Sequence, residues 1–109
     1  TEKFASRVIK VYVELNKRSY DDVGKVLSKQ FLRSGTSIGA NCSEAEFAQS
    51  KADFRSKLTI ALKEAGETRY WMTLLIKNNI VPEYKLNLML DEVNQIIKIL
   101  IATTKKLKE

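Results

Sequence analysis

The sequence contains no histidine, and this absence excludes several classes of enzyme. Without an imidazole the chain has no Ser-His-Asp or Cys-His nucleophile system, no HExxH zinc site and no histidine proton shuttle. The single cysteine, Cys42, excludes an intramolecular disulfide framework and a thiolate metal cluster. We therefore predict a protein that is not an enzyme and that needs no metal and no cofactor.

Turn-forming residues and long hydrophobic runs are scarce as well. One proline and four glycines are too few for a many-stranded sandwich or barrel, so the composition favours long helices. The longest uncharged apolar stretch covers residues 70–76, far below the roughly 20 residues that cross a bilayer, and no segment resembles a signal peptide. We expect a cytoplasmic protein without membrane contact, folded as a single domain over residues 1–109.

Apolar residues recur every three or four positions, which predicts two helices in the first half of the chain. The first presents Phe4, Val8, Val11, Tyr12 and Leu15 on one face. The second is expected to begin near Tyr20, capped by Ser19 and Asp22, and its apolar line is Val23, Leu27, Phe31, Ser34, Ile38, Asn41 and Ala45. Its glycines, Gly35 and Gly39, predict close approach of another helix, with a kink as the alternative.

The second half of the chain predicts two further helices. Ser50 and Asp53 form a capping pattern before the third helix, and Asn78 with Asn79 ends it. Pro82 suits the first turn of the fourth helix, which is expected to reach Leu107. Its buried line is Leu86, Leu90, Val93, Ile97, Leu100, Thr104 and Leu107. Short connections favour antiparallel neighbours, so the fold class is all-α, an up-down-up-down four-helix bundle.

Positive charge is in excess, with 19 basic against 13 acidic residues, a net charge of +6 and a pI near 9.5. Basic residues recur at helical spacing on the first two helices, an arrangement that can follow a phosphate backbone. The predicted nucleic-acid contacts are Lys3, Arg7, Lys10, Lys17, Lys25, Lys29 and Arg33. A merely solvated face is the alternative, and Lys105, Lys106 and Lys108 are either an extension of the patch or a frayed tail.

Several apolar residues point away from the predicted core. Because aromatic residues are favoured at interface centres, we interpret them as an oligomer interface. The set is Ile60, Trp71, Leu74, Leu88 and Ile99. The alternative is that the third and fourth helices are slightly rotated, or that the loop between the first two helices partly covers Trp71.

Polar residues on the inner faces predict a structural network that fixes the register of the helices. Its members are Arg33, Asn41, Glu44 and Glu67, with Arg69 and Thr68 as further hydrogen-bond partners. A hydrolase or nuclease that uses Glu44 and Glu67 with a divalent metal is the competing hypothesis. Cys42 lies among small residues and is interpreted as buried packing without thiol reactivity.

The residues from 30 to 67 resemble the bacterial four-helix bundle family of the 23S rRNA-intervening-sequence proteins. The positions that carry the resemblance are Gln30, Arg33, Ser37, Ile38, Asn41, Glu44, Ala45 and Glu67, whereas Gly39 stands where proline is common and Glu64 where serine is common. The resemblance implies an antiparallel bundle that assembles into homopentamers. A similar fold, the accessory variability protein of diversity-generating retroelements, implies contact with nucleic acid and a reverse transcriptase.

Together these observations predict a non-enzymatic homo-oligomer, a pentamer by the resemblance, that binds structured RNA or DNA through basic helical faces. The competing prediction is an oligomeric scaffold that recruits a protein partner, such as a reverse transcriptase. In that case the positive charge serves only solubility or the recognition of an acidic partner. Binding that survives high salt would favour the scaffold.

Overall fold

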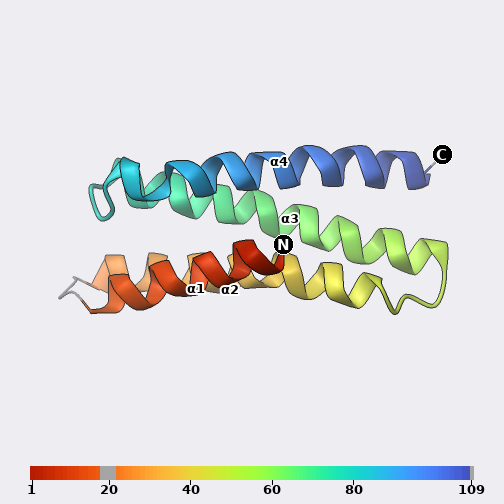
Figure 1. The fold of residues 1–109 in the computed structure, drawn as a ribbon, viewed down its shortest axis with the longest axis horizontal. Helices are drawn as coiled ribbons and strands as arrows, with labels where there is room; N and C mark the ends of the chain where they lie inside the picture. Colours follow the sequence, from red (N-terminus) through yellow and green to blue (C-terminus); the bar gives the residue numbers. More distant parts are fainter. Residues whose placement is uncertain (18–21, 109) are drawn as a thin grey trace.

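Four antiparallel α-helices form an elongated bundle in the computed structural model, which describes residues 1–17 and 22–108 (Figure 1). The helices are α1 (Glu2–Asn16), α2 (Asp22–Ala45), α3 (Lys51–Lys77) and α4 (Glu83–Lys108). Each runs opposite to the one before it, as the short connections predict. The all-α bundle is therefore confirmed, and it measures 47 × 21 × 20 Å. In the described residues no helix is both long and apolar enough to cross a membrane.

The core consists of the inner faces of the four helices. Phe4, Phe31, Met72 and Leu86 are buried in one large cluster that runs through most of the bundle. A smaller cluster around Leu58 continues it toward the far end of α4. Burial of these large apolar side chains supplies most of the driving force for folding.

α1 is the shortest helix, with 15 residues against 24 to 27 in the others. It therefore packs along only part of the bundle, and Figure 1 shows the N-terminus near the middle of the long axis. The close approach predicted at Gly35 is confirmed: a Cβ there would lie 2.8 Å from Cγ2 of Val8 on α1. At Gly39 the contact is looser, since the nearest atom, the Thr1 carbonyl oxygen, would be 3.6 Å away.

Local signals place the ends of α3 as predicted. The Ser50 hydroxyl accepts a hydrogen bond from the Asp53 amide at 3.0 Å, and the Asp53 carboxylate accepts one from the Gln49 amide at 3.2 Å. After α3 the chain turns through Asn79, which has the left-handed φ of 59°. Pro82 lies immediately before α4, one residue earlier than expected.

Val23 was predicted on the buried face of α2, and this prediction is wrong. Its side chain is 60% exposed. Cross-helix contacts such as Ser34 with Thr68 align α2 against α3, and the same register places Val23 beyond the end of α3 at Lys77. Periodicity gives the direction of a side chain but not where the neighbouring helix stops. The predicted cap at Ser19 and the start near Tyr20 lie outside the described residues.

Candidate nucleic-acid interface

The first predicted basic stripe lies on the outer surface of α1. Lys3, Lys10 and Lys17 are seven residues apart, which brings them to nearly the same side of a helix. All three are exposed, and none forms an ion pair within residues 1–17 and 22–108. We call them the α1 lysine row. Their ammonium groups are available to an anionic partner.

The second stripe lies on α2, on the side turned away from the core. Lys25 and Lys29 are exposed one turn apart, and they too lack an ion pair in the part of the chain that the structure describes. Exposed Ile9 and Val13 lie on the α1 surface between this pair and the α1 lysine row. The two stripes therefore form neighbouring strips rather than one continuous patch.

Arg33, the last predicted cation of α2, is engaged by two carboxylates of α3. Its Nη2 donates to Glu67 Oε2 at 2.7 Å, and its Nη1 donates to Glu64 Oε2 at 3.2 Å. The hydrogen bond to Glu67 raises the pKa of the guanidinium, and Glu64 adds to that effect. Glu64 is only 7% exposed and was not anticipated from the sequence. Arg33 therefore links α2 to α3, and the two carboxylates already compensate its positive charge.

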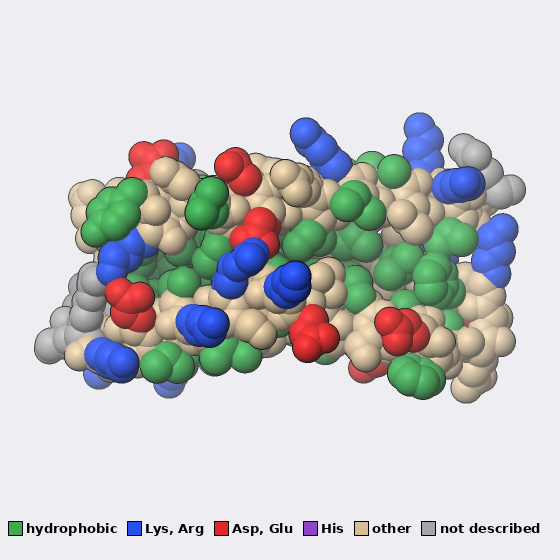
Figure 2. Space-filling model, viewed as in Figure 1, with side chains coloured by type: hydrophobic (Ala, Val, Ile, Leu, Met, Phe, Trp, Pro, Cys, Tyr) green, Lys and Arg blue, Asp and Glu red, His purple; other side chains and the backbone are tan. Residues whose placement is uncertain are grey.

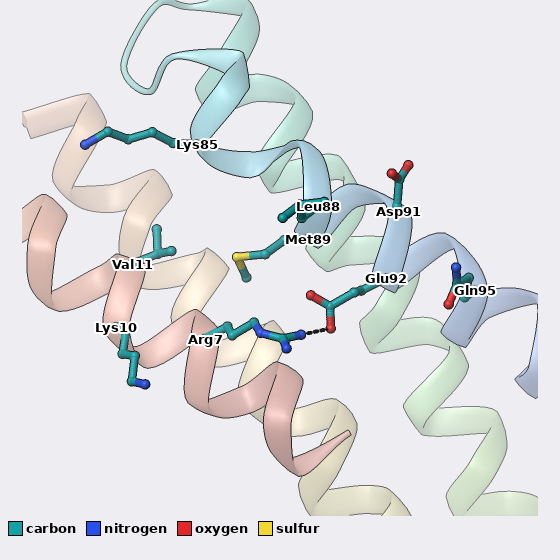
Figure 3. A pocket seen from close by; sticks show the side chains of 9 residues that line it. All are labelled: Arg7, Lys10, Val11, Lys85, Leu88, Met89, Asp91, Glu92 and Gln95. Carbon is teal, nitrogen blue, oxygen red and sulfur yellow. Dashed lines mark hydrogen bonds and ion pairs between the residues drawn. The ribbon is translucent and has the colours of Figure 1, made fainter.

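Arg7 is also paired, across the open side of the bundle between α1 and α4 (Figure 3). It donates to Glu92, and two helical turns away Lys85 Nζ donates to Glu14 Oε1 at 2.6 Å. The two pairs bridge a groove of about 710 Å³ whose lining includes Val11. The two charged residues of each helix are seven positions apart. One alignment of α1 against α4 therefore allows both ion pairs to form.

The predicted polar network is only partly assembled. Arg33 and Glu67 meet, but Asn41 donates within α2 to the Ser37 carbonyl at 2.9 Å. Glu44 is exposed and lies 3.5 Å from Lys57 Nζ. The α2–α3 register separates the ion pairs of Glu44 and Glu67 by roughly ten residues, about 15 Å along the bundle. These two carboxylates do not share a site, so they cannot act together as the competing hypothesis of a hydrolase or nuclease requires.

The predicted interface residues lie on two sides of the bundle. Leu88 and Ile99 are 78% and 63% exposed on α4, and each lines a hollow beside α1. The α3 members, Ile60, Trp71 and Leu74, share a side with Glu67 and therefore border α2. Ile60 is exposed, whereas Trp71 and Leu74 are half-buried and Trp71 packs against the main core.

Cys42 is half-buried on α2, close to Thr1 of α1. Burial raises the pKa of its thiol, although the neighbouring N-terminal charge and a hydrogen bond with Thr1 act in the opposite direction. A higher pKa leaves less of the nucleophilic thiolate at neutral pH. This environment fits a packing role for the side chain.

The fold and its surfaces define a basic, antiparallel four-helix bundle with a helix-to-helix ion-pair framework. The sequence profile of the 23S rRNA-intervening sequence proteins matches residues 1–102, and the chain belongs to this family. It is similar to a crystal structure of a Bacteroides thetaiotaomicron protein of unknown function from the S23 ribosomal protein family. The identity is 46%, the match covers 94% of this chain and 93% of that one, and the TM-score is 0.82. No curated protein sequence matches the chain.

Proposed function

We propose that this protein is a non-enzymatic homo-oligomer that binds structured RNA or DNA through the lysines of α1 and α2. The observation that carries the proposal is the contrast between its cations. Arg7 and Arg33 are paired with carboxylates, whereas the five lysines on these two helices and at the C-cap of α1 are exposed and have no ion pair among the described residues. Exposed cations that retain their full charge release counterions from a phosphate backbone and so favour binding.

Charge reversal on α2 tests the contact directly. We expect Lys25→Glu combined with Lys29→Glu to weaken binding of a structured RNA by at least about tenfold at roughly 50 mM salt, since two attractive contacts become repulsive. Fluorescence anisotropy of a labelled RNA hairpin measures the affinity. Raising the salt to about 200 mM should weaken wild-type binding on the order of 500-fold if five phosphates are neutralised.

A matched control has the same net charge as the α2 variant but carries the two changes elsewhere on the surface. Lys63→Glu with Lys77→Glu makes the same change at two exposed lysines of α3, on other surfaces of the bundle. This control should bind RNA more tightly than the α2 variant. Equal losses in both variants would show that only net charge matters, and an unchanged affinity in the α2 variant would remove Lys25 and Lys29 from the site.

Self-association is tested best at the most exposed apolar residues of α4. We expect Leu88→Glu combined with Ile99→Glu to lower the molar mass of the assembly measured by light scattering, because carboxylates would be buried in the interface. Both side chains are exposed in the single chain, so the fold itself should tolerate the change. Trp71→Glu is less informative, since Trp71 also packs against the core. An unchanged mass with a native circular dichroism spectrum would exclude this side of α4 from the interface.

A further inference from the structure

Both arginines of α3 are held in place by neutral acceptors on α4. Arg55 Nε donates to the Thr104 carbonyl oxygen at 3.0 Å, and Arg69 Nη1 donates to Asn94 Oδ1 at 3.1 Å. Neither arginine forms an ion pair within residues 1–17 and 22–108. The arginines of α1 and α2, in contrast, are bound by carboxylates. α3 therefore presents positioned positive charges that no ion pair compensates.

The acidic residues of α3 and α4 lie away from most of these cations. The three carboxylates of α3 accept hydrogen bonds from α2 or from the turn between α2 and α3. They are Asp53, Glu64 and Glu67. The last acidic residues of α4 are Asp91 and Glu92, and the helix continues beyond them to Lys108 for about four turns. Glu92 faces α1 in its ion pair with Arg7, whereas exposed Asp91 marks the edge of the positively charged part of α4.

Four exposed lysines lie beside the arginines of α3. Lys51 and Lys108 line a hollow of about 470 Å³ with Arg55, where the beginning of α3 meets the end of α4. Lys98 and Lys105 lie four and eleven residues after the asparagine of α4 that binds α3, and therefore on the same side of that helix. None of the four lysines forms an ion pair in the part of the chain that the structure describes. We call these six cations the α3–α4 basic surface: Lys51, Arg55, Arg69, Lys98, Lys105 and Lys108.

The α3–α4 basic surface lies on the opposite side of the bundle from the lysines of α1 and α2. Each helix packs mainly against its neighbours in chain order, and α1 has little contact with α4. Figure 2 shows Lys and Arg side chains that extend from the C-terminal half of α4 past the outline of the bundle, with no acidic side chain over that half of the helix in this view. The surface is also separate from the predicted interface residues, because Leu88 and Ile99 border α1 whereas Trp71 borders α2.

We propose that the α3–α4 basic surface is a second binding site for the phosphate backbone of a nucleic acid, and that it holds a segment other than the one bound by α1 and α2. This inference rests on the proposed function and adds a second segment of the same class of ligand. Guanidinium groups bind phosphate through two parallel hydrogen bonds, and arginines that are already positioned lose less entropy when they do so. Ile101, exposed among the cations, offers an apolar contact beside them.

One nucleic-acid stem cannot reach both sites of a chain. The bundle is 21 × 20 Å in cross-section, and the two basic surfaces point away from each other across it. A duplex is straight on this scale, because its persistence length is about 150 base pairs. A chain that uses both sites therefore holds two stems and joins them.

Capture of one RNA hairpin by another tests for two sites. A hairpin fixed to beads first binds the protein at about 50 mM salt, and a second, fluorescent hairpin is then added. We expect the wild-type protein to hold the fluorescent hairpin on the beads. Lys51→Glu combined with Lys98→Glu should reduce the fluorescence retained per bound protein at least about fivefold, because two attractive contacts of the second site become repulsive. The amount of protein on the beads should change less than about twofold, since the lysines of α1 and α2 still bind the first hairpin.

Lys63→Glu combined with Lys77→Glu is the matched control. It makes the same change in net charge at two exposed lysines of α3 that are not part of the α3–α4 basic surface, and it should retain at least about half of the wild-type fluorescence. Lys51 and Lys98 are exposed and unpaired among the described residues, so their variant should keep the circular dichroism spectrum of the wild type. If it does not, Lys51→Gln with Lys98→Gln replaces it, with an expected loss of at least about threefold.

The failures of the two proposals look different. If the wild-type protein does not bind the hairpin on the beads, the proposed function is wrong and the second site falls with it. If the protein binds that hairpin but retains no fluorescent one, or if the Lys51 and Lys98 variant retains as much as its control, the second site is overturned. In those cases the lysines of α1 and α2 remain a nucleic-acid site.

Discussion

Replacement of Gly35 by leucine should lower the free energy of unfolding by about 3 kcal/mol, because the position has no room for a side chain. A Cβ at Gly35 would meet three atoms of Val8, at 2.8, 2.9 and 3.3 Å. Val8 is fully buried and branched at Cβ, so it cannot rotate away cheaply. The remaining atoms of leucine would force α1 away from α2. Chemical denaturation followed by circular dichroism measures the loss.

Gly66 provides a matched control on α3. A Cβ there has no described atom within 4 Å beyond its own helix and its chain neighbours. Gly66→Ala should therefore stabilise the protein by about 1 kcal/mol through helix propensity alone. Gly35→Ala gains the same propensity but suffers the clash with Val8, so it should be less stable than Gly66→Ala. A similar gain at both positions would contradict the close contact of α1 with α2.

A second substitution can relieve the clash. In the background of Gly35→Ala, Val8→Ala removes the two methyl groups that the new Cβ would meet. The double variant should be more stable than the sum of the two single changes predicts, by about 1 kcal/mol, as is usual for residues in direct contact. Additive effects on the free energy of unfolding would mean that the loss of stability caused by Gly35→Ala does not come from contact with Val8.

The features that the sequence predicted correctly depend on residues close together in the chain. The Ser50 and Asp53 cap joins residues three positions apart, and the inner faces follow from a period of 3.6 residues. Even the close contact at Gly35 was visible locally, since a glycine inside a long helix lowers helix propensity without an evident local gain. The fold class follows from such local patterns together with the short connections.

The features that were missed depend on which residues of different helices are level with each other. Glu64 was not among the predicted site residues, and its partner Arg33 is 31 residues away in the chain. Arg7 was predicted as a nucleic-acid contact, although it forms an ion pair with Glu92, 85 residues further on. One signal was present in the sequence. Arg7 with Glu14 and Lys85 with Glu92 have the same seven-residue spacing, in the charge order that antiparallel helices need for two ion pairs.

The ion pairs of Arg33 lead to the second large stability prediction. Arg33→Met should lower the free energy of unfolding by about 2 kcal/mol at neutral pH. Methionine keeps much of the packing of the alkyl chain but leaves the carboxylate of Glu64, only 7% exposed, without its cation. Loss of one partner from a fully buried pair costs about 3 to 5 kcal/mol. The smaller value expected here reflects the half-exposed Arg33 side chain, which water already screens.

Two further variants determine whether the uncompensated carboxylate causes that loss. Lys29→Met removes a positive charge one helical turn before Arg33 on α2. Lys29 has no ion pair among the described residues, so this change should alter the free energy of unfolding by less than about 0.5 kcal/mol. Glu64→Gln, added to Arg33→Met, removes the buried negative charge and should restore at least about 1 kcal/mol. If the second change restores nothing, the contribution of Arg33 comes from Glu67 and from packing, because the charge on Glu64 would then be tolerated without a partner.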